Sequence, residues 1–269
     1  MKKSPLLLCL VTGCLLNIGM ANAQEADSTG LPGDNFSLQG AIEMFKKAGS
    51  PEEFEKMINT ESNNVNNLDL NNDGQTDYIR VIDKSEKDAH AFVLQVAVSE
   101  TENQDIAVIE LEKTGAESAV LQIVGDEEIY GEQVIVEASD GSNDEEEENP
   151  AKNGPSFNYY SNPPMVVNVW LWPSVRFVYR PAYVPWVSPW RWKLHPTWWR
   201  PWRPLGWRVF HPLARRHHSF CRVVRTHRVV VAHRVYTPFR TSSVVVRNRH
   251  AGAVRNYRVT RTKVRGKRG

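Results

Sequence analysis

Ala91-Phe-Val-Leu-Gln-Val-Ala-Val-Ser99 alternates large apolar side chains with smaller or polar ones. Its large side chains, from Phe92 to Val98, fall on one side of an extended chain, because successive residues of a strand point to opposite faces. Similar stretches surround it, and they predict four or five strands, at 78–83, 91–99, 106–113, 119–124 and 133–137. The connections between these stretches are short, which favours an antiparallel meander.

Two short helices are predicted before the strands. Residues 36–48 carry apolar side chains at helical spacing. A second helix is expected to begin at Ser50, with Ser50 as its N-cap, Pro51 in its first turn and Glu53 completing a capping box. The sequence therefore predicts an acidic α+β module at 36–138, in which two short helices pack on a small antiparallel β-meander.

The chain divides into two halves of opposite charge. All 31 acidic residues lie between Glu25 and Glu148 together with seven basic ones, so this half has a formal charge of −24. Residues 151–269 contain 24 lysines and arginines, no acid, and all nine tryptophans. Such a split favours association of the two halves, within one molecule or between molecules, unless salt screens the attraction.

An acidic run from Asp140 to Glu148 separates the halves, and blocks of like charge resist ordering. The remaining segments are a flexible N-terminus at 24–35, an acidic linker at 139–153, a Trp/Pro/Arg-rich segment at 154–212 and a basic tail at 213–269. Frequent prolines predict that the Trp/Pro/Arg-rich segment is largely irregular. The tail has too few bulky apolar residues for a core of its own, so we expect it to be disordered until it meets a polyanion.

The loop Leu68-Asp-Leu-Asn-Asn-Asp-Gly-Gln-Thr-Asp-Tyr78 lies before the first predicted strand. Its oxygen-bearing groups are spaced so that they can surround one hard cation, and Gly74 permits the sharp turn that this requires. The candidate ligands are Asp69, Asn71, Asp73, Gln75 and Asp77. Arg80 stands where an EF-hand has a bidentate Glu, so we expect weak, structural Ca²⁺ binding. The alternative is a metal-free turn in which Asn, Asp and Gly serve the backbone geometry.

Four stretches of the acidic module carry a resemblance to known proteins. They are Phe54-Glu-Lys-Met-Ile-Asn59, Asn67-Leu-Asp-Leu-Asn-Asn-Asp-Gly-Gln-Thr-Asp-Tyr-Ile-Arg-Val81, Asp105-Ile-Ala-Val-Ile-Glu110 and Gln122-Ile-Val-Gly-Asp126. Together they resemble an uncharacterised family of exported bacterial envelope proteins with an Asp-x-Asn-x-Asp-Gly-x-x-Asp loop. The resemblance is confined to the N-terminal module and implies export to a bacterial envelope, without indicating a reaction.

The Trp/Pro/Arg-rich segment interleaves indole rings with guanidinium groups, as in Trp198-Trp-Arg-Pro-Trp-Arg-Pro204. Guanidinium groups bind phosphate, sulfate or carboxylate, while indole rings stack on sugars or bases or enter a lipid interface. The residues that we expect to bind a polyanion are Arg191, Trp192, Trp198, Trp199, Arg200, Trp202 and Arg203. The alternative is that these aromatic side chains pack on the sheet of the acidic module.

The basic tail also contains side chains that can bind metals or act as nucleophiles, namely His217, His218, Cys221, His227 and His233. Their sequence neighbours are cationic, which opposes the binding of another cation. The basic half contains no acidic residue that could orient a catalytic histidine beside Cys221. The sequence therefore argues against both a metal cluster and a nucleophilic enzyme in the tail.

Residues 1–23 have the features of a cleavable secretory signal. Two lysines precede an apolar stretch that is too short to span a bilayer, and Ala21-Asn-Ala23 supplies small residues for cleavage. Val11-Thr-Gly-Cys14 resembles a lipobox, so a lipoprotein anchored at Cys14 is the less favoured alternative. We predict an exported protein of the periplasm or outer envelope, with no transmembrane span.

Three functions are compatible with these features. The favoured one is a non-enzymatic envelope protein whose cationic, aromatic C-terminal half binds an anionic polymer, such as lipopolysaccharide, acidic polysaccharide or extracellular DNA, with peripheral membrane contact as a further option. The second is a structural protein that self-assembles by pairing its acidic module with its basic tail. The third is a hydrolase that uses carboxylates of the acidic half, for which the sequence shows no paired Asp/Glu set.

Overall fold

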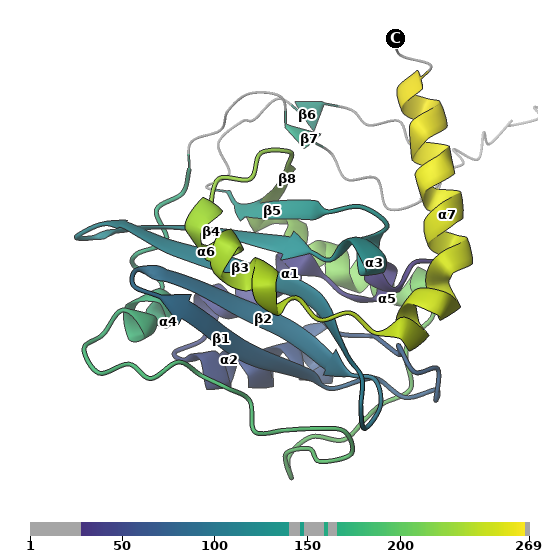
Figure 1. Ribbon diagram of the computed structural model, residues 1–269, viewed down its shortest axis with the longest axis horizontal. Helices are drawn as coiled ribbons and strands as arrows, with labels where there is room; N and C mark the ends of the chain where they lie inside the picture. The colour runs from purple at the N-terminus through teal and green to yellow at the C-terminus, as the bar shows by residue number, and fades with distance from the viewer. Residues whose placement is uncertain (1–27, 140–145, 148–158, 161–165, 267–269) are drawn as a thin grey trace, which may run out of the picture.

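The computed structural model describes residues 28–139, 146–147, 159–160 and 166–266. The predicted signal sequence at 1–23 and most of the predicted linker at 139–153 lie outside these residues. An antiparallel sheet forms the centre of the molecule, and helices cover both of its faces (Figure 1). The expected α+β class is therefore confirmed.

The sheet has the strand order β1-β2-β3-β4-β5-β8-β7-β6. Its strands are β1 (Ile79–Glu86), β2 (Ala89–Ala97), β3 (Asn103–Gly115), β4 (Ser118–Gly125), β5 (Val134–Ala138), β6 (Glu146–Glu147), β7 (Tyr159–Tyr160) and β8 (Cys221–Val224). Every pairing from β1 to β8 is antiparallel along this order, and the two-residue β7 then pairs parallel with β8.

The helices come from both halves of the chain. The α-helices are α1 (Leu38–Lys47), α2 (Pro51–Ile58), α3 (Glu127–Tyr130), α4 (Pro173–Val178), α5 (Trp207–Ala214), α6 (Val230–Tyr236) and α7 (Val244–Gly266). The 3-10 helices are η1 (Pro32–Asn35), η2 (Glu61–Asn63), η3 (Arg215–Phe220) and η4 (Thr237–Phe239). Among the described residues, no helix combines the length and the apolar character needed to cross a membrane.

Helix α2 begins as its sequence indicates, with one difference. The hydroxyl of Ser50 accepts a hydrogen bond from the amide of Glu53 at 3.1 Å. The Glu53 carboxylate reaches back to the amide of Gly49 at 2.7 Å, one residue earlier than in a standard capping box. Both interactions satisfy amides at the helix start that have no partner within the helix.

The two faces of the sheet bury different side chains. On the inner face, Phe92 of β2 packs against Phe45 of α1, which in turn contacts Phe54 of α2, with ring centroids 5.1 and 5.2 Å apart. Leu94, Val96 and Val98 share this core, as the alternation of the strand predicts. The outer face buries a smaller apolar cluster beneath α6, made of Ala91, Val93, Val108, Val124, Ile135, Val224 and Tyr236.

The basic half covers both edges of the meander formed by β1 to β5. Along β1, the amide of Asp83 donates to the carbonyl of Trp186 at 2.7 Å, and the amide of Ser188 donates to the carbonyl of Val81 at 3.0 Å. At the other edge, β8 pairs with β5. Because exposed strand edges invite pairing with other chains, these contacts protect the sheet.

The described part of the segment at 154–212 is largely irregular, as expected, apart from β7, α4 and the start of α5, whereas the expectation of a disordered tail at 213–269 is wrong. Helices α6 and α7, the 3-10 helices η3 and η4 and strand β8 lie within the described residues of the tail. Apolar side chains from it, including Val223, Val229 and Val246, are buried. The tail is ordered because its apolar side chains pack on the sheet of the acidic module, so it does not need a core of its own.

Candidate functional site

The Trp-rich part of the chain is anchored by one buried carboxylate. Glu55 of α2 is 2% exposed and accepts four hydrogen bonds. Two come from Tyr78 Oη (2.8 Å) and the Val81 amide (2.9 Å), and two come from Trp186 Nε1 (3.1 Å) and Ser188 Oγ (2.9 Å). Burial raises the pKa of Glu55, while its four donors favour the ionised form. This residue therefore fixes the course of the chain beside β1.

A second set of contacts holds the same part of the chain against the Asp/Asn loop. The Thr76 amide donates to the carbonyl of Trp202 at 2.8 Å. The side-chain amide of Asn67 accepts from the Leu205 amide at 2.7 Å and donates to the Leu205 carbonyl at 2.9 Å. The Asp/Asn loop and the Trp/Pro/Arg-rich segment, which the sequence analysis treats separately, are thus neighbours in the fold.

A cavity of about 300 Å³ lies between these two segments. It is lined by Asn71, Asp73, Gln75, Thr76, Asp77, Tyr78, Arg80, Ala97, Arg191, Trp192, Lys193, His195, Trp199 and Pro201. The volume is at the lower end of the range for small-molecule sites. The structure therefore brings four of the five predicted calcium ligands and three of the seven predicted polyanion-binding residues to one hollow of mixed charge.

Within the Asp/Asn loop, the predicted ligand oxygens bind backbone amides of the loop itself. Asp69 accepts from the amides of Asp73 (3.1 Å) and Gly74 (2.9 Å). Asp77 accepts from the Leu70 amide at 2.6 Å. Burial and the nearby carboxylates of Asp69 and Asp73 raise the pKa of Asp77 to about 7. These contacts are those of a tight turn, and calcium binding by the loop stays a prediction.

The predicted polyanion-binding residues do not all face solvent. Arg191, Arg200 and Arg203 are exposed, and Trp198 is 45% exposed. Trp199 is 4% exposed and packs edge-on against Tyr78, with ring centroids 5.1 Å apart. Trp192 and Trp202 are half-buried. The alternative of packing on the acidic module therefore holds for Trp199.

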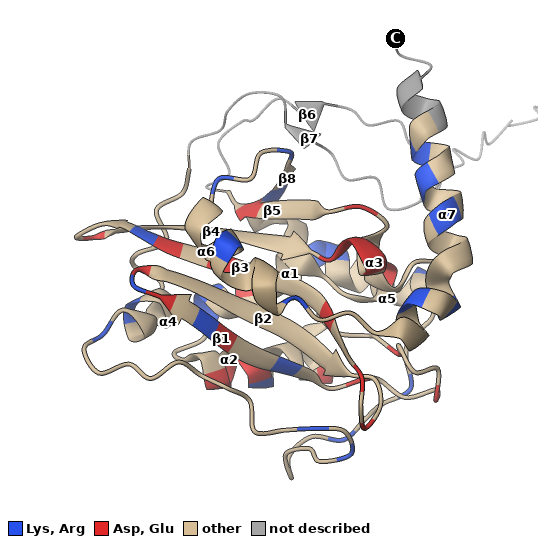
Figure 2. Cartoon of the chain, in the orientation of Figure 1, with Lys and Arg blue, Asp and Glu red and all other residues tan. Residues whose placement is uncertain are grey.

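The arginines of the 176–216 stretch share two properties. All are exposed, and within the described part of the chain none lies within 4.0 Å of a carboxylate. They are Arg176, Arg180, Arg191, Arg200, Arg203, Arg208, Arg215 and Arg216. Figure 2 shows blue segments in the long connection below β1 and α2, which belongs to this stretch. These guanidinium groups are therefore open to an external anion.

Many of the basic residues that follow residue 216 contact carboxylates of the acidic module. We call residues 217–261 the basic strap, because most of their arginines and three of their histidines contact carboxylates of the acidic module. The pairs are His217–Glu43, Arg222–Glu137, His227–Glu110, Arg228–Glu137, His233–Glu110, Arg240–Asp126, Arg247–Glu128, Arg258–Glu127 and Arg261–Glu132. The attraction expected between the two halves is therefore realised within one chain.

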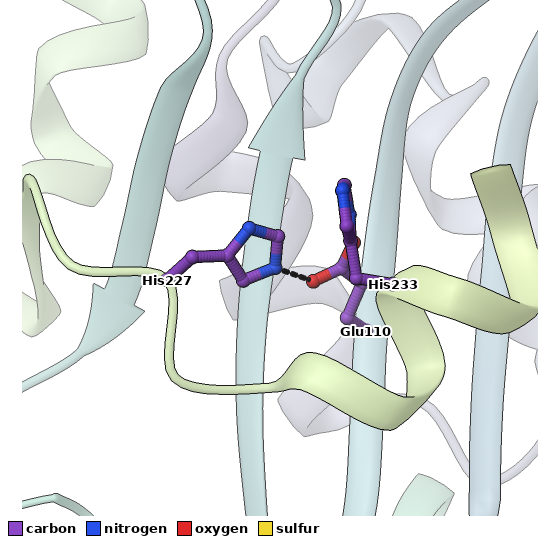
Figure 3. A group of neighbouring side chains, drawn as sticks. All are labelled: Glu110, His227 and His233. Atoms are coloured by element: carbon purple, nitrogen blue, oxygen red, sulfur yellow. Dashed lines mark hydrogen bonds and ion pairs between the residues drawn. The ribbon is translucent and has the colours of Figure 1, made fainter.

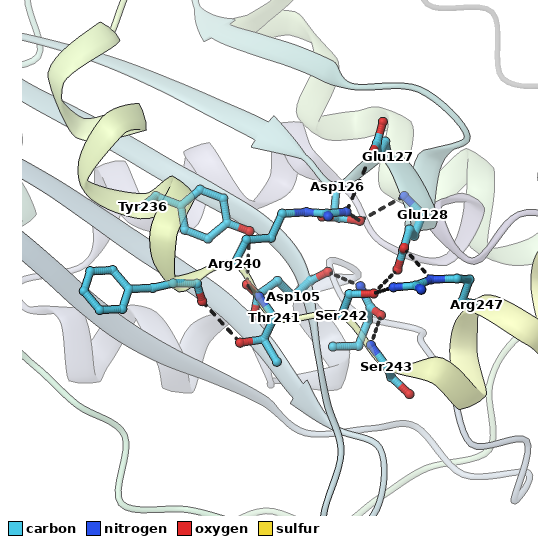
Figure 4. A network of polar contacts seen from close by, with 12 residues as sticks. Asp105, Asp126, Glu127, Glu128, Tyr236, Arg240, Thr241, Ser242, Ser243 and Arg247 are labelled. Atoms are coloured by element: carbon cyan, nitrogen blue, oxygen red, sulfur yellow. Dashed lines mark hydrogen bonds and ion pairs between the residues drawn. The ribbon is translucent and has the colours of Figure 1, made fainter.

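Figure 4 shows the central part of the strap crossing the end of the sheet. Asp105 accepts hydrogen bonds from the hydroxyl of Tyr236 (3.0 Å) and the amide of Thr241 (2.7 Å). Asp126 binds Arg240 a few residues away in the strap. Burial raises the pKa of Asp105 to about 6 and also raises the pKa of Asp126.

Sequence reasoning missed one cluster on the outer face. His227 and His233 both contact Glu110 of β3, a residue more than a hundred positions earlier (Figure 3). This contact raises the pKa of His233. One feature of the sequence could have indicated this cluster. Glu110 is a charged residue in a predicted strand that is otherwise mostly apolar. Cys221, by contrast, is buried, and burial raises the pKa of its thiol to about 12, which disfavours a thiolate nucleophile.

Comparison with protein-family models, with curated proteins and with solved structures found no match. The candidate site is therefore assigned from its geometry. It consists of the exposed arginines at 176–216, the indole rings between them and the cavity that they share with the Asp/Asn loop.

Proposed function

We propose that this chain is a non-enzymatic, exported envelope protein that binds an anionic polymer through residues 176–216. One observation carries the proposal. Eight arginines of this stretch are exposed without a carboxylate partner among the described residues, whereas most arginines of the basic strap contact a carboxylate of the acidic module. The proposal therefore assigns the binding surface to the Trp/Pro/Arg-rich segment and the first residues after it, and not to the rest of the C-terminal tail.

The chemistry of the exposed groups suits a polymer with regularly spaced phosphate, sulfate or carboxylate groups. A guanidinium group presents a planar fork of donors that matches the oxygens of such anions. Trp198 is 45% exposed and lies two residues before Arg200 in the chain, and indole rings stack on sugars or bases. Acidic polysaccharide, lipopolysaccharide and extracellular DNA all share these two features.

The remainder of the molecule acts as a scaffold in this proposal. Glu55 and Asn67 hold the Trp-rich chain in place through contacts with Trp186, Ser188 and Leu205. A chain fixed in this way loses less conformational entropy on binding than a disordered tail would. Pairing of the strap with the acidic module also neutralises part of the negative charge of that module, which would otherwise repel a polyanion.

The same stretch exposes apolar side chains, which supports contact with an anionic lipid surface as one form of the proposal. Val184 is 78% exposed, Val187 is 59% exposed and Leu194 is 53% exposed. Apolar and aromatic side chains beside cationic ones are typical of proteins that bind at a lipid interface. Lipopolysaccharide presents both phosphate and acyl chains and would engage both kinds of group.

A second candidate function is self-assembly by exchange of the basic strap. Strand β8 and the strap contact residues that lie about a hundred positions earlier, and the same contacts can form between two chains. Exchange of an identical element is a low-cost route to oligomers. Light scattering distinguishes the two candidates, because exchange gives a dimer or larger species and polymer binding does not require one.

The proposal is tested by replacing exposed arginines of the proposed binding surface and, as a control, exposed arginines of the basic strap. Full-length protein with Arg191→Ala, Arg200→Ala and Arg203→Ala should bind heparin, lipopolysaccharide or DNA at least tenfold more weakly than the unmodified protein. The control replaces Arg234 and Arg255 with Ala, because both are exposed strap arginines that contact no carboxylate among the described residues.

Salt dependence gives the second readout. Each phosphate that the protein neutralises on duplex DNA contributes about −0.9 to the slope of log affinity against log salt. The triple variant should therefore have a shallower slope, while Trp198→Ala should weaken binding with little change in slope. Equal loss of affinity in the control variant would contradict the assignment of the surface, and no binding by any protein would contradict the proposed function.

A further inference from the structure

Three side chains that can bind a metal converge on the outer face of the sheet. Glu110 of β3 is 0% exposed, and its two carboxylate oxygens point toward two imidazole rings (Figure 3). Its Oε1 lies 2.7 Å from Nδ1 of His233, and its Oε2 contacts Nε2 of His227. The three ligand atoms all lie within 4.8 Å of one another. In the described part of the chain this is the one such group of three.

We propose that Glu110, His227 and His233 bind one Zn²⁺ ion, with water at the fourth position. Two imidazole nitrogens and a carboxylate oxygen form a known zinc ligand set. With metal–ligand bonds of about 2.0–2.2 Å, the ligand atoms of a tetrahedral site lie about 3.3 Å apart. The observed spacing of the three atoms is therefore reached by small side-chain rotations.

The surrounding structure leaves room above Glu110 and holds the histidines in place. Ala91 lies directly opposite Glu110 on β2, and its methyl group leaves space for two rings. The side chain of Gln122 accepts hydrogen bonds from the amides of Arg228 (2.7 Å) and Val229 (3.0 Å). The loop that carries His227 into α6 and His233 is thus fixed to the sheet.

The charge around the cluster is compatible with a cation, although its sequence neighbours are arginines. Arg222 and Arg228 both bind Glu137, the cross-strand neighbour of Gln122. Glu110 and Glu112 have no lysine or arginine partner among the described residues. The sequence neighbours of the histidines oppose a metal, but the fold brings Glu110 and Glu112 of the acidic module beside them.

The position of the cluster also allows an ion to enter. The side chains of His227 and His233 are 21% and 32% exposed, whereas that of Glu110 is buried. The open ligand position therefore faces the solvent side. Bound zinc would join β3 to the strap at two positions six residues apart and so lock α6 onto the sheet.

The competing explanation for the same geometry is a metal-free cluster in which a protonated histidine neutralises the buried Glu110. Calorimetric titration of metal-stripped, full-length protein with zinc chloride separates the two. We expect one zinc per chain, and at least tenfold weaker binding in His227→Ala and in His233→Ala. His218→Ala is the control, because His218 lies in the same half but outside the cluster, and it should bind zinc normally.

Two measurements keep the test valid if an alanine variant is unstable. Glu110→Gln preserves the shape of the side chain but removes its charge, and it should also weaken zinc binding at least tenfold. X-ray absorption of the zinc-bound protein should show two imidazole ligands and no sulfur. No binding at micromolar zinc, or binding that survives both histidine substitutions, would overturn the proposal in favour of the metal-free cluster.

Discussion

The guanidinium group of Arg240 binds both carboxylate oxygens of Asp126, with Nε 2.7 Å from Oδ2 and Nη2 3.1 Å from Oδ1. Asp126 is also the N-cap of α3, where its Oδ1 accepts from the Glu128 amide at 2.9 Å. One buried carboxylate therefore starts a helix of the acidic module and holds the basic strap. This pair therefore holds the basic strap on the acidic module.

Replacement of Arg240 with Ala should lower the free energy of unfolding by about 2–3 kcal/mol, because it leaves the buried carboxylate of Asp126 without its charged donors. Urea unfolding of the full-length protein measures this loss. Arg255→Ala is the matched control, since Arg255 is exposed on α7, and it should stay within about 0.5 kcal/mol of the unmodified protein. Equal effects of the two substitutions would show that the strap does not depend on this pair.

The pH dependence of stability should change when Asp105 is replaced. Burial raises its pKa from 3.8 to about 6, so between these values the folded state holds a proton that the unfolded state has lost. The stabilising contribution of the neutral form is complete below 3.8 and is lost as the pH rises through about 6.

Asp105→Asn cannot ionise, so its stability relative to the unmodified protein should improve as the pH rises from about 4 to about 7. Chemical unfolding at several pH values in this window measures the difference between the two proteins. A difference that is constant across the window would mean that Asp105 titrates normally in the folded state.

The α+β class and some elements of the acidic module could be predicted because their signals are local. The alternation through Phe92 and Val98 sets the inner face of β2, and the serine at position 50 marks the start of α2. The packing of the basic half could not be predicted in the same way. Val223 and Val246 belong to no apolar pattern long enough to predict a helix or strand core, and they become buried only against the acidic module.

The candidate sites also differ in whether the sequence alone could predict them. The close spacing of Trp and Arg at 191–203 predicts a polyanion-binding surface. Nothing in the sequence, however, distinguishes the exposed Trp198 from the buried Trp199. The cluster at Glu110 could not be predicted, because Glu110 lies more than a hundred positions before His227 and His233. Long-range pairing of charges depends on the topology of the chain, which local periodicity does not reveal.

Calcium should raise the melting temperature of the protein if the Asp/Asn loop binds it. A cation that binds only the folded loop stabilises it by mass action, and at about millimolar calcium a weak extracellular-type site is occupied. Asp73→Ala should abolish the shift, because it removes a predicted ligand on an exposed turn. Glu100→Ala, at another exposed position, should retain it. Identical melting curves with calcium and with chelator would leave the loop as a metal-free turn.

Arginine-selective chemical labelling of the full-length protein, with and without bound heparin, tests the central claim most directly. Mass spectrometry of the labelled peptides reports which guanidinium groups the polymer covers. We predict that Arg191, Arg200 and Arg203 lose reactivity when heparin binds, while the exposed strap residues Arg234 and Arg255 keep theirs. Protection confined to Arg234 and Arg255 would contradict the account, because it would place the polyanion on the basic strap.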